Sequence, residues 1–327
     1  MRVLVTGASG LLGGHVAELL SARGDRVRAM VRKTSNRKVL EGLANVELFE
    51  GTVERADRVR EAVEGVDAIV HCAGIVKARS ADEFFSVNVG GTSNLVEAAR
   101  KLGGKLKRFV HVSSLEACGP SADGGPVPAD QESPVTAYGR SKLAAEKVVL
   151  SGKDDLSVVI LRPGAIYGPR DGEILEAFKS IQRGLLPLVD GGAARGVWIY
   201  ATDCAEACIR AIDADVPSGR IYFVDDGCGP LAQKEMLADA ERALGTKAFV
   251  RASLPVPVLM TVARGVEVFG RLANRPVMLT REKATMLLLD WVCSSEETRR
   301  DLGWAPKVPW GEGVLRAVAW YRENGWL

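Results

Sequence analysis

A tyrosine and a lysine four residues apart, Tyr138 and Lys142, form the most specific chemical signal in the sequence. They fall in a segment predicted to be helical, where residues i and i+4 share one face. A free tyrosine has a pKa of about 10, and an adjacent ammonium group favours the phenolate. A tyrosine tuned in this way can pass a proton to or from a substrate oxygen near neutral pH. The alternative interpretation is an amphipathic helix that carries a surface pair.

Two serine hydroxyls at the end of a predicted strand add a third member to this set. Ser113 and Ser114 follow Val112 directly, upstream of the helix that carries the tyrosine. A strand-end hydroxyl that joins the tyrosine and the lysine counts against the surface-pair interpretation. The residues alone leave the two serines as competing candidates.

Three glycines at a spacing of three residues, Gly7, Gly10 and Gly13, follow the first predicted strand and open a helix. This is the context in which a dinucleotide-binding turn forms. The first glycine permits the tight turn, the second lets backbone N–H groups approach a pyrophosphate, and the third lets helix and strand pack closely. The alternative is a purely structural turn. The residues of the turn expected to contact a dinucleotide are Gly7, Ser9, Gly10, Leu11, Leu12 and Gly13.

The elements that must position these groups alternate between strand and helix. Strands are predicted at residues 2–5, 26–31, 46–49, 68–71, 107–112 and 156–161. Helices are predicted at residues 11–22, 56–63, 82–102 and 135–150. This alternation indicates βαβ units and a parallel sheet covered on both faces. The predicted fold is therefore α/β, with a Rossmann-type doubly wound parallel sheet.

The regular alternation of strand and helix ends after Arg162, where a loop rich in proline and glycine begins. We predict a dinucleotide-binding Rossmann domain over residues 1–162. Residues 196–224, which are expected to form a strand, a helix and a strand, are predicted to rejoin it. Residues 163–195 and 225–327 are predicted to form a smaller, mostly helical substrate-binding region.

The composition argues against several classes of protein. The chain of 327 residues carries 43 basic and 41 acidic side chains, a net charge of +2, which gives no pull toward nucleic acid. Six cysteines form no CxxC pair and three histidines fall at no ligand spacing, so no metal site is predicted. Charged residues interrupt the apolar stretch 254–272. We therefore expect no integral membrane segment, and we expect a cytoplasmic location.

Motifs along nearly the whole chain resemble the extended short-chain dehydrogenases/reductases of the NAD-dependent epimerase/dehydratase superfamily. The glycine spacing is that of the family. Further matching segments are HCAG at 71–74, NVGGT at 88–92, RPGAIYGP at 162–169 and LGWAP at 302–306. The stretch 113–120 is most similar to the 3β-hydroxysteroid dehydrogenases, and the stretch 27–32 resembles the dihydroflavonol reductases.

The resemblance implies a catalytic triad of Ser114, Tyr138 and Lys142, because Ser114 lies five residues before Gly119 as in the family pattern. It also implies a homodimer built on the helices predicted at 82–102 and 135–150. The further residues that it assigns to cofactor binding are Thr52, Val53, Cys72, Ala73, Gly74, Val112, Ser113, Tyr138, Lys142, Pro163, Ala165 and Ile166. At Thr52 the sequence departs from the family, which usually has an aspartate next to the adenine.

The end of the second predicted strand decides between the two nicotinamide cofactors. An NAD enzyme normally has an acidic residue there, which accepts a hydrogen bond from the ribose 2′-OH. This sequence has none, whereas Arg32, Lys33 and Ser35 suit a 2′-phosphate. NADP(H) is therefore favoured as the cofactor, with NAD(H) as the alternative.

Together these features predict an NADP(H)-dependent oxidoreductase that interconverts a ketone and a secondary alcohol. The expected substrate is bulky and hydrophobic, and is steroid-like, flavonoid-like or a β-keto acyl compound. The apolar segments 254–260 and 286–289 form either core or a lid over it.

The alternative function is that of a nucleotide-sugar epimerase or dehydratase with tightly bound NAD. Sugar dehydratases have an aspartate where Leu115 stands, which argues against dehydration. Glu116 either touches the substrate or caps the loop. A third alternative, a non-catalytic redox sensor, is disfavoured by the intact triad.

Overall fold

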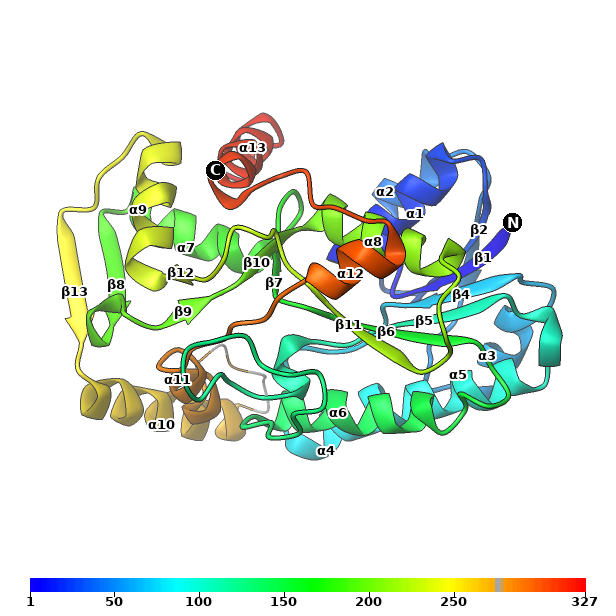
Figure 1. Ribbon diagram of the computed structural model, residues 1–327. Helices are drawn as coiled ribbons and strands as arrows, with labels where there is room; N and C mark the ends of the chain where they lie inside the picture. Colours follow the sequence, from blue (N-terminus) through cyan, green and yellow to red (C-terminus); the bar gives the residue numbers. More distant parts are fainter. Residues whose placement is uncertain (274–276, 278) are drawn as a thin grey trace.

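The computed structural model describes residues 1–273, 277 and 279–327. In this part of the chain the central feature is a seven-stranded sheet in the order β11-β6-β5-β4-β1-β2-β3 (Figure 1). Its strands are β1 (Arg2–Thr6), β2 (Arg26–Val31), β3 (Val46–Glu50), β4 (Ala68–His71), β5 (Arg108–Val112), β6 (Val158–Pro163) and β11 (Arg220–Val224). Every neighbouring pair is parallel. The predicted doubly wound α/β fold is therefore confirmed.

Helices cover both faces of this sheet (Figure 1). One face carries α1 (Leu11–Ala22), α2 (Lys38–Glu41), α8 (Ala201–Asp213) and α12 (Glu296–Leu302). The other carries α3 (Ala56–Val63), α5 (Gly91–Arg100) and α6 (Ala137–Leu150). Successive side chains of β1 alternate between the layers, because Val3 and Val5 pack in the first core and Leu4 in the second. Burial of both faces explains the continuous apolar runs of these strands.

The helix predicted over 82–102 is not continuous. The structure has α4 (Ala81–Phe84), a π-helical turn (Phe85–Gly90) and then α5. The π turn carries Asn88, whose buried side chain bonds the backbone N–H and C=O of Ile75 at 2.8 and 3.2 Å. Such wide turns often mark functional sites within helices. Hydrophobic periodicity alone does not reveal this turn, which contacts the loop after β4 through Asn88.

Helix α6 begins at Ala137, two residues later than predicted, because Thr136 caps it. The Thr136 hydroxyl accepts a hydrogen bond from the Gly139 N–H at 2.9 Å. An N-cap residue has extended backbone angles and satisfies one of the free N–H groups of the first turn. The cap thereby fixes the start of the helix just before Tyr138.

A second region follows β6 and lies beside the carboxyl ends of the sheet strands (Figure 1). Its strands pair in three short two-stranded sheets, β7-β10, β9-β12 and β8-β13. The elements are β7 (Ala165–Tyr167), α7 (Gly172–Gln182), β8 (Leu185–Val189), β9 (Arg195–Gly196), β10 (Trp198–Tyr200), β12 (Leu231–Ala232), α9 (Gln233–Leu244), β13 (Val250–Leu254), α10 (Val256–Leu272), α11 (Arg281–Met286) and α13 (Trp310–Glu323). Among the described residues, no helix combines the length and the apolar character needed to cross a bilayer.

The chain leaves the main sheet after β6 and returns to it in part. Strand β11 pairs with β6, and α8 packs in the core beside α1. Strand β10 instead pairs with β7, outside the main sheet. Of the segment 196–224, which was predicted to rejoin the Rossmann domain, only the part from α8 onward therefore packs with the main sheet. The predicted substrate-binding segment 225–327 includes residues 274–276 and 278, which lie outside the described residues.

Candidate active site

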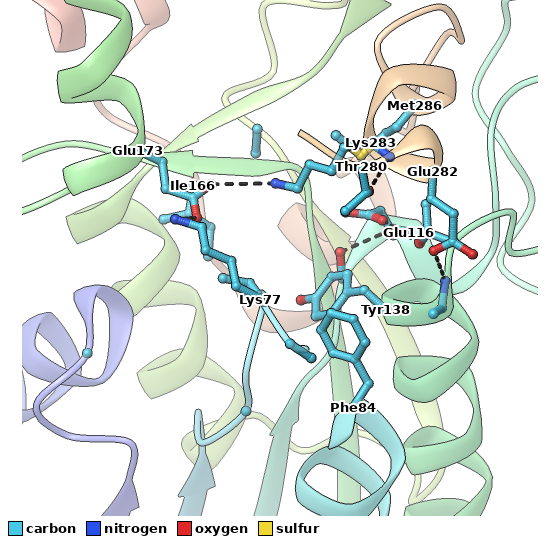
Figure 2. A pocket seen from close by; sticks show the side chains of 18 of the residues that line it. Lys77, Phe84, Glu116, Tyr138, Ile166, Glu173, Thr280, Glu282, Lys283 and Met286 are labelled. Carbon is cyan, nitrogen blue, oxygen red and sulfur yellow. Dashed lines mark hydrogen bonds and ion pairs between the residues drawn. The ribbon is translucent and has the colours of Figure 1, made fainter. Parts of the chain in front are cut away.

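A cavity of about 790 Å³ lies at the carboxyl ends of β1, β4, β5 and β6. The inner wall comes from the loops that follow these strands, and the outer wall from α10 and α11. Figure 2 shows side chains from both walls pointing into the same space. The carboxyl ends of parallel strands, where the strand order reverses, are the usual binding crevice of open α/β sheets.

A smaller cavity of about 220 Å³ extends from the first toward the ends of β2 and β3. The two cavities share Gly7, Gly10, Cys72 and Gly74 on their walls, so they form one continuous groove. Such a groove has two lobes on either side of the glycine turn. That shape suits a ligand with two halves joined at a pyrophosphate.

The glycine turn is a backbone cradle that a side chain would fill. Gly7 has φ +69°, and a Cβ built on it would lie 2.8 Å from the Ala73 backbone nitrogen. A Cβ on Gly13 would lie 2.3 Å from the Gly7 carbonyl oxygen. Leu11 and Leu12 in the first turn of α1 line the large cavity. The first turn of a helix has free N–H groups and a positive dipole end, so these residues fit the pyrophosphate of a dinucleotide.

Most of the residues predicted to bind the cofactor lie on the groove. The large cavity is lined by Gly7, Gly10, Leu11, Leu12, Gly13, Cys72, Gly74, Ser113, Tyr138, Pro163, Ala165 and Ile166. The small cavity adds Ser9, Arg32, Thr52, Val53 and Ala73. Lys33, Val112 and Lys142 are not on either wall. Sequence reasoning missed Met30, Glu54, Ile75 and Val87, which also line the small cavity.

Of the three predicted catalytic residues, two lie on the cavity wall and one lies behind it. Ser114 and Tyr138 line the large cavity. Lys142 is buried behind them, and its Nζ donates to the Val112 carbonyl oxygen at 2.7 Å. Burial lowers the pKa of Lys142 to about 8, although nearby Glu146 opposes the shift. The structure thus brings the serine and the tyrosine together at the cavity, with the lysine tied to the end of β5.

The pKa of Tyr138 is raised above its ordinary value, opposite to the expectation from an adjacent ammonium group. Burial is the largest cause, and the carboxyl group of Glu116 adds to it, whereas a hydrogen bond with Ser114 lowers the pKa in part. Lys142 is not among the groups that lower the pKa of Tyr138, and its ammonium group donates to the Val112 carbonyl. In this environment Tyr138 is a neutral phenol, which is the form that donates a proton.

The two adjacent serines have different environments. The Ser113 hydroxyl donates to the buried carboxylate of Glu146, which forms a two-bond ion pair with Arg162. The Ser114 hydroxyl accepts from the Glu116 N–H at 3.1 Å and also reaches Tyr138. Because Ser113 is held by a buried charged group, its hydroxyl is unavailable to a substrate. The geometry therefore favours Ser114 over Ser113.

A chain of buried hydrogen bonds ties the strand ends to α6. His71 bonds the Thr6 and Thr92 hydroxyls at 2.7 and 2.9 Å. The Thr92 hydroxyl donates to the Asn88 carbonyl, and the Asn88 amide donates to the Ser141 hydroxyl at 2.9 Å. Burial lowers the pKa of His71 to about 3, so its ring is neutral. Fully satisfied buried networks of this kind rigidify the elements that they join.

Glu116 ties the loop after β5 to α6 and also lines the cavity, and its contact with substrate stays a prediction. Its carboxylate accepts a hydrogen bond from the Thr136 hydroxyl at 2.7 Å, which ties the loop after β5 to the cap of α6. The side chain also lines the cavity close to Tyr138 (Figure 2). Burial raises the pKa of Glu116, which favours its protonated form.

Helix α11 closes the outer side of the cavity and contacts the start of α6. Glu282 accepts from the Ala137 N–H at 2.7 Å and pairs with Arg140 at 2.8 Å. Lys283, the next residue, reaches Glu173 at the start of α7 (Figure 2). Sequence reasoning did not find Glu282 or Lys283, because a polar pair on a short helix carries no local signal of a tertiary contact.

Comparisons with known proteins agree with this geometry. Residues 3–224 match the NAD dependent epimerase/dehydratase family. The chain is 32% identical to the ceramide reductase of Caulobacter vibrioides, with 99% of this chain and 96% of the relative covered. It is 30% identical to a 3 beta-hydroxysteroid dehydrogenase/Delta 5→4-isomerase of Mycobacterium tuberculosis, covering 98% and 90%. The solved structure of DesIV, a dTDP-glucose 4,6-dehydratase of Streptomyces venezuelae, superposes with a TM-score of 0.81 at 26% identity, covering 100% and 98%.

Proposed function

The chain belongs to the NAD dependent epimerase/dehydratase family, and we propose that it is an NADP(H)-dependent oxidoreductase that interconverts a ketone and a secondary alcohol. The observation that carries this proposal is that Ser114 and Tyr138 line one cavity with the glycine turn. Relatives named as a ceramide reductase and a 3 beta-hydroxysteroid dehydrogenase favour an oxidoreductase that acts on CH–OH groups.

The reaction divides between the cofactor and the residues of the chain. A bound nicotinamide would donate a hydride to the carbonyl carbon in reduction and accept one from the alcohol carbon in oxidation. Ser114 holds the substrate oxygen by a hydrogen bond. In reduction, the Tyr138 phenol gives its proton to that oxygen, and in oxidation it takes the proton back. Lys142 lies one helical turn from Tyr138, behind the cavity wall, where its ammonium group holds the end of β5 through the Val112 carbonyl.

Apolar side chains on the cavity wall support a bulky hydrophobic substrate. They come from the loop after β4, from α4, β7 and α11, and from position 277 before α11: Val76, Phe84, Ile166, Val277 and Met286. An apolar wall with a few convergent polar groups is the usual composition of a small-molecule site. Met286 belongs to the apolar segment for which the sequence allowed either a core or a lid role.

The experiment that tests the function starts with a cofactor titration. Purified protein is titrated with NADPH and with NADH. Ketosteroids and β-keto acyl compounds are then screened by cofactor absorbance, and UDP-sugars by chromatography of the sugar product, because a dehydratase returns its hydride and leaves no net change in cofactor absorbance. Turnover of a ketone with NADPH supports the proposal. The second candidate is a nucleotide-sugar dehydratase, which the likeness to DesIV favours and Leu115 disfavours. Turnover of UDP-sugars alone would establish that candidate instead.

Arg32→Asp should weaken NADPH binding by about an order of magnitude or more and leave NADH binding unchanged or improved. The Arg32 side chain is exposed on the small cavity, and the Arg32 backbone N–H donates to the Ser35 hydroxyl at 3.2 Å. A hydrogen bond to a charged group contributes about 1.5–3 kcal/mol, which matches the expected loss. Fluorescence titration with each cofactor measures it. Unchanged NADPH affinity in the variant would remove Arg32 from the proposal.

We propose that two copies of the chain associate through the face formed by the α4–α5 segment and α6. Phe85 in the π turn and Val135 before α6 are exposed apolar side chains on this face, at 39% and 37% of their full area. Exposed apolar groups of this kind favour a symmetric contact between copies. Light scattering at micromolar concentration should give twice the chain mass, and Phe85→Glu should reduce it to one chain. A monomeric wild-type protein would refute the dimer.

A further inference from the structure

Helix α10 forms part of the outer cavity wall, and its inner face is apolar as expected for a helix that covers a core. Leu259 and Ala263 are buried and pack with Ala284 of α11. Glu267 and Gly270 line the large cavity. A helix packed in this way normally carries polar and charged residues on its solvent side. The solvent side of α10 does not follow that pattern.

Five apolar side chains on the solvent side of α10 form an exposed stripe, which we call the α10 stripe. Their exposed fractions are 46% for Val258, 47% for Val262, 49% for Val268, 70% for Phe269 and 83% for Leu272. These positions recur at steps of three, four or seven residues, which places them on one side of a helix. Figure 1 shows α10 along the lower edge of the molecule, below α11.

The outer side of α13 shows the ordinary pattern for comparison. The structure describes α13 completely, and its exposed residues include Glu312, Arg316, Arg322 and Glu323. Leu315 is an exposed apolar side chain among these charges, at 56% of its full area. Single apolar side chains of that kind are normal on a protein surface, whereas a contiguous apolar patch marks a site of interaction. The α10 stripe is a patch of the second kind.

The charged residues around the α10 stripe are mainly basic. Segment 256–280 contains three arginines and one acidic residue. The acidic residue, Glu267, is only 15% exposed and pairs with Arg281 at 3.0 Å, so its charge is neutralised on the cavity side of the helix. Arg264 is exposed on the solvent side. An apolar helix face with basic residues beside it is typical of helices that lie in the interface of an anionic membrane.

The α10 stripe lies close to the wall of the large cavity. Phe269 is followed directly by Gly270, which lines the cavity, and Val277, five residues after Leu272, lines it as well. The C-terminal half of α10 therefore has the stripe on one side and the cavity on the other. A bulky apolar substrate of the class proposed above partitions from water into an apolar environment. A bilayer in contact with the stripe would hold such a substrate one helix away from the cavity.

We propose that the α10 stripe docks the protein on the surface of an anionic lipid bilayer, with Phe269 and Leu272 among the acyl chains and Arg264 at the headgroups. Helix α10 then lies in the plane of the interface. The proposal goes beyond the oxidoreductase function, because it states where the protein meets a hydrophobic substrate. It rests on the exposed side chains and their charges, and its test needs no turnover.

The test is sedimentation of the purified protein with two kinds of lipid vesicle, one of phosphatidylcholine alone and one that also contains phosphatidylglycerol. The wild-type protein should bind the anionic vesicles, and added salt should weaken this binding. Phe269→Gln/Leu272→Gln should lower the partition coefficient by about a hundredfold, about tenfold for each apolar side chain lost from the bilayer. Arg264→Gln should lower it by about fivefold on anionic vesicles only, the effect of one basic residue near the surface.

A matched control separates the α10 stripe from exposed apolar surface in general. Leu315→Gln removes an exposed leucine from α13 and should leave vesicle binding at the wild-type level. Phe269 and Leu272 are both largely exposed, so their replacement should not disturb the core. Thermal unfolding verifies that every variant is folded.

The outcomes decide between a membrane and other occupants of the stripe. Wild-type protein that stays in solution with both kinds of vesicle overturns the proposal, and so does binding that Phe269→Gln/Leu272→Gln does not reduce. Equal binding to both kinds of vesicle overturns the part assigned to Arg264. If the protein binds neither vesicle and the double variant has a lower mass in light scattering, the stripe contacts a second copy of the chain instead. Failure of vesicle binding leaves the oxidoreductase function standing, and failure of the ketone screen leaves the docking surface standing.

Discussion

Replacing Tyr138 by phenylalanine should lower turnover by about 10²–10⁴-fold, the range that general acid–base catalysis contributes. The change removes the phenolic proton and keeps the ring, which packs against Phe84 with centroids 5.9 Å apart. NADPH affinity should therefore stay close to wild type. The measurement is kcat for ketone reduction on the substrate that the screen identifies, together with a cofactor titration.

The pH dependence gives an independent signature of the same group. Ketone reduction needs the protonated phenol, and burial raises the Tyr138 pKa above its ordinary value. The donor form therefore persists as pH rises, and the alkaline loss of rate should begin later than a free tyrosine, with a pKa of about 10, would allow. Ser114 lowers the Tyr138 pKa by its hydrogen bond. Ser114→Ala should thus reduce the rate and move the alkaline limb further upward.

A matched control separates catalysis from packing. Tyr222 in β11 donates to Asp301 at 3.1 Å and lies outside the cavity wall. Tyr222→Phe removes a hydroxyl of the same kind, so it should change the unfolding free energy slightly and leave kcat unchanged. Retention of more than about a tenth of the wild-type rate by Tyr138→Phe would mean that another group transfers the proton, because a loss of at least about a hundredfold is expected.

The parts of the site that the sequence predicts are those set by local spacing. Gly7 and Gly13 are six residues apart on one turn, and Tyr138 and Lys142 lie one helical turn apart. The relative positions of these residues follow once the local segment is known to be a strand or a helix, and hydrophobic periodicity predicts that. The choice of Ser114 over Ser113 came from a family pattern. The physical reason for this choice is that the Ser113 hydroxyl donates to Glu146, a contact that exists only where α6 packs beside β5.

The parts that the sequence did not predict depend on contacts between distant segments. Lys77, Glu173 and Lys283 lie in the loop after β4, in α7 and in α11, and they meet only in the folded chain. Strand β8 is a short apolar run, and β13 mixes apolar residues with Arg251 and Ser253, so a local pattern does not distinguish either from helix or loop. The direction of the Tyr138 pKa shift is also opposite to the expectation from the sequence, because it depends on burial and on the nearby carboxyl group of Glu116. These features are tertiary, and local propensity carries no information on them.

Breaking the buried Glu146–Arg162 pair should lower the free energy of unfolding by about 3–5 kcal/mol, the cost of leaving one buried charge without its partner. Both side chains are 1% exposed. Arg162 donates to both carboxylate oxygens at 2.9 and 2.6 Å and to the Ala129 carbonyl at 2.7 Å. In Glu146→Met the guanidinium keeps only the carbonyl. Urea unfolding of Glu146→Met and Arg162→Met measures the loss.

The double variant Glu146→Met/Arg162→Met should be more stable than either single variant, because replacing a buried ion pair by apolar side chains of similar volume is often neutral. Some loss should remain, since the Ser113 hydroxyl and the Ala129 carbonyl lose their partners. Additive losses in the double variant would contradict the interpretation, because they would mean that the two charges do not depend on each other. The pair also joins β5, β6 and α6, which carry Ser114, Pro163 and Tyr138 to the cavity. A single variant that still folds at low temperature should therefore lose turnover as well, since the charge left alone displaces the ends of these elements.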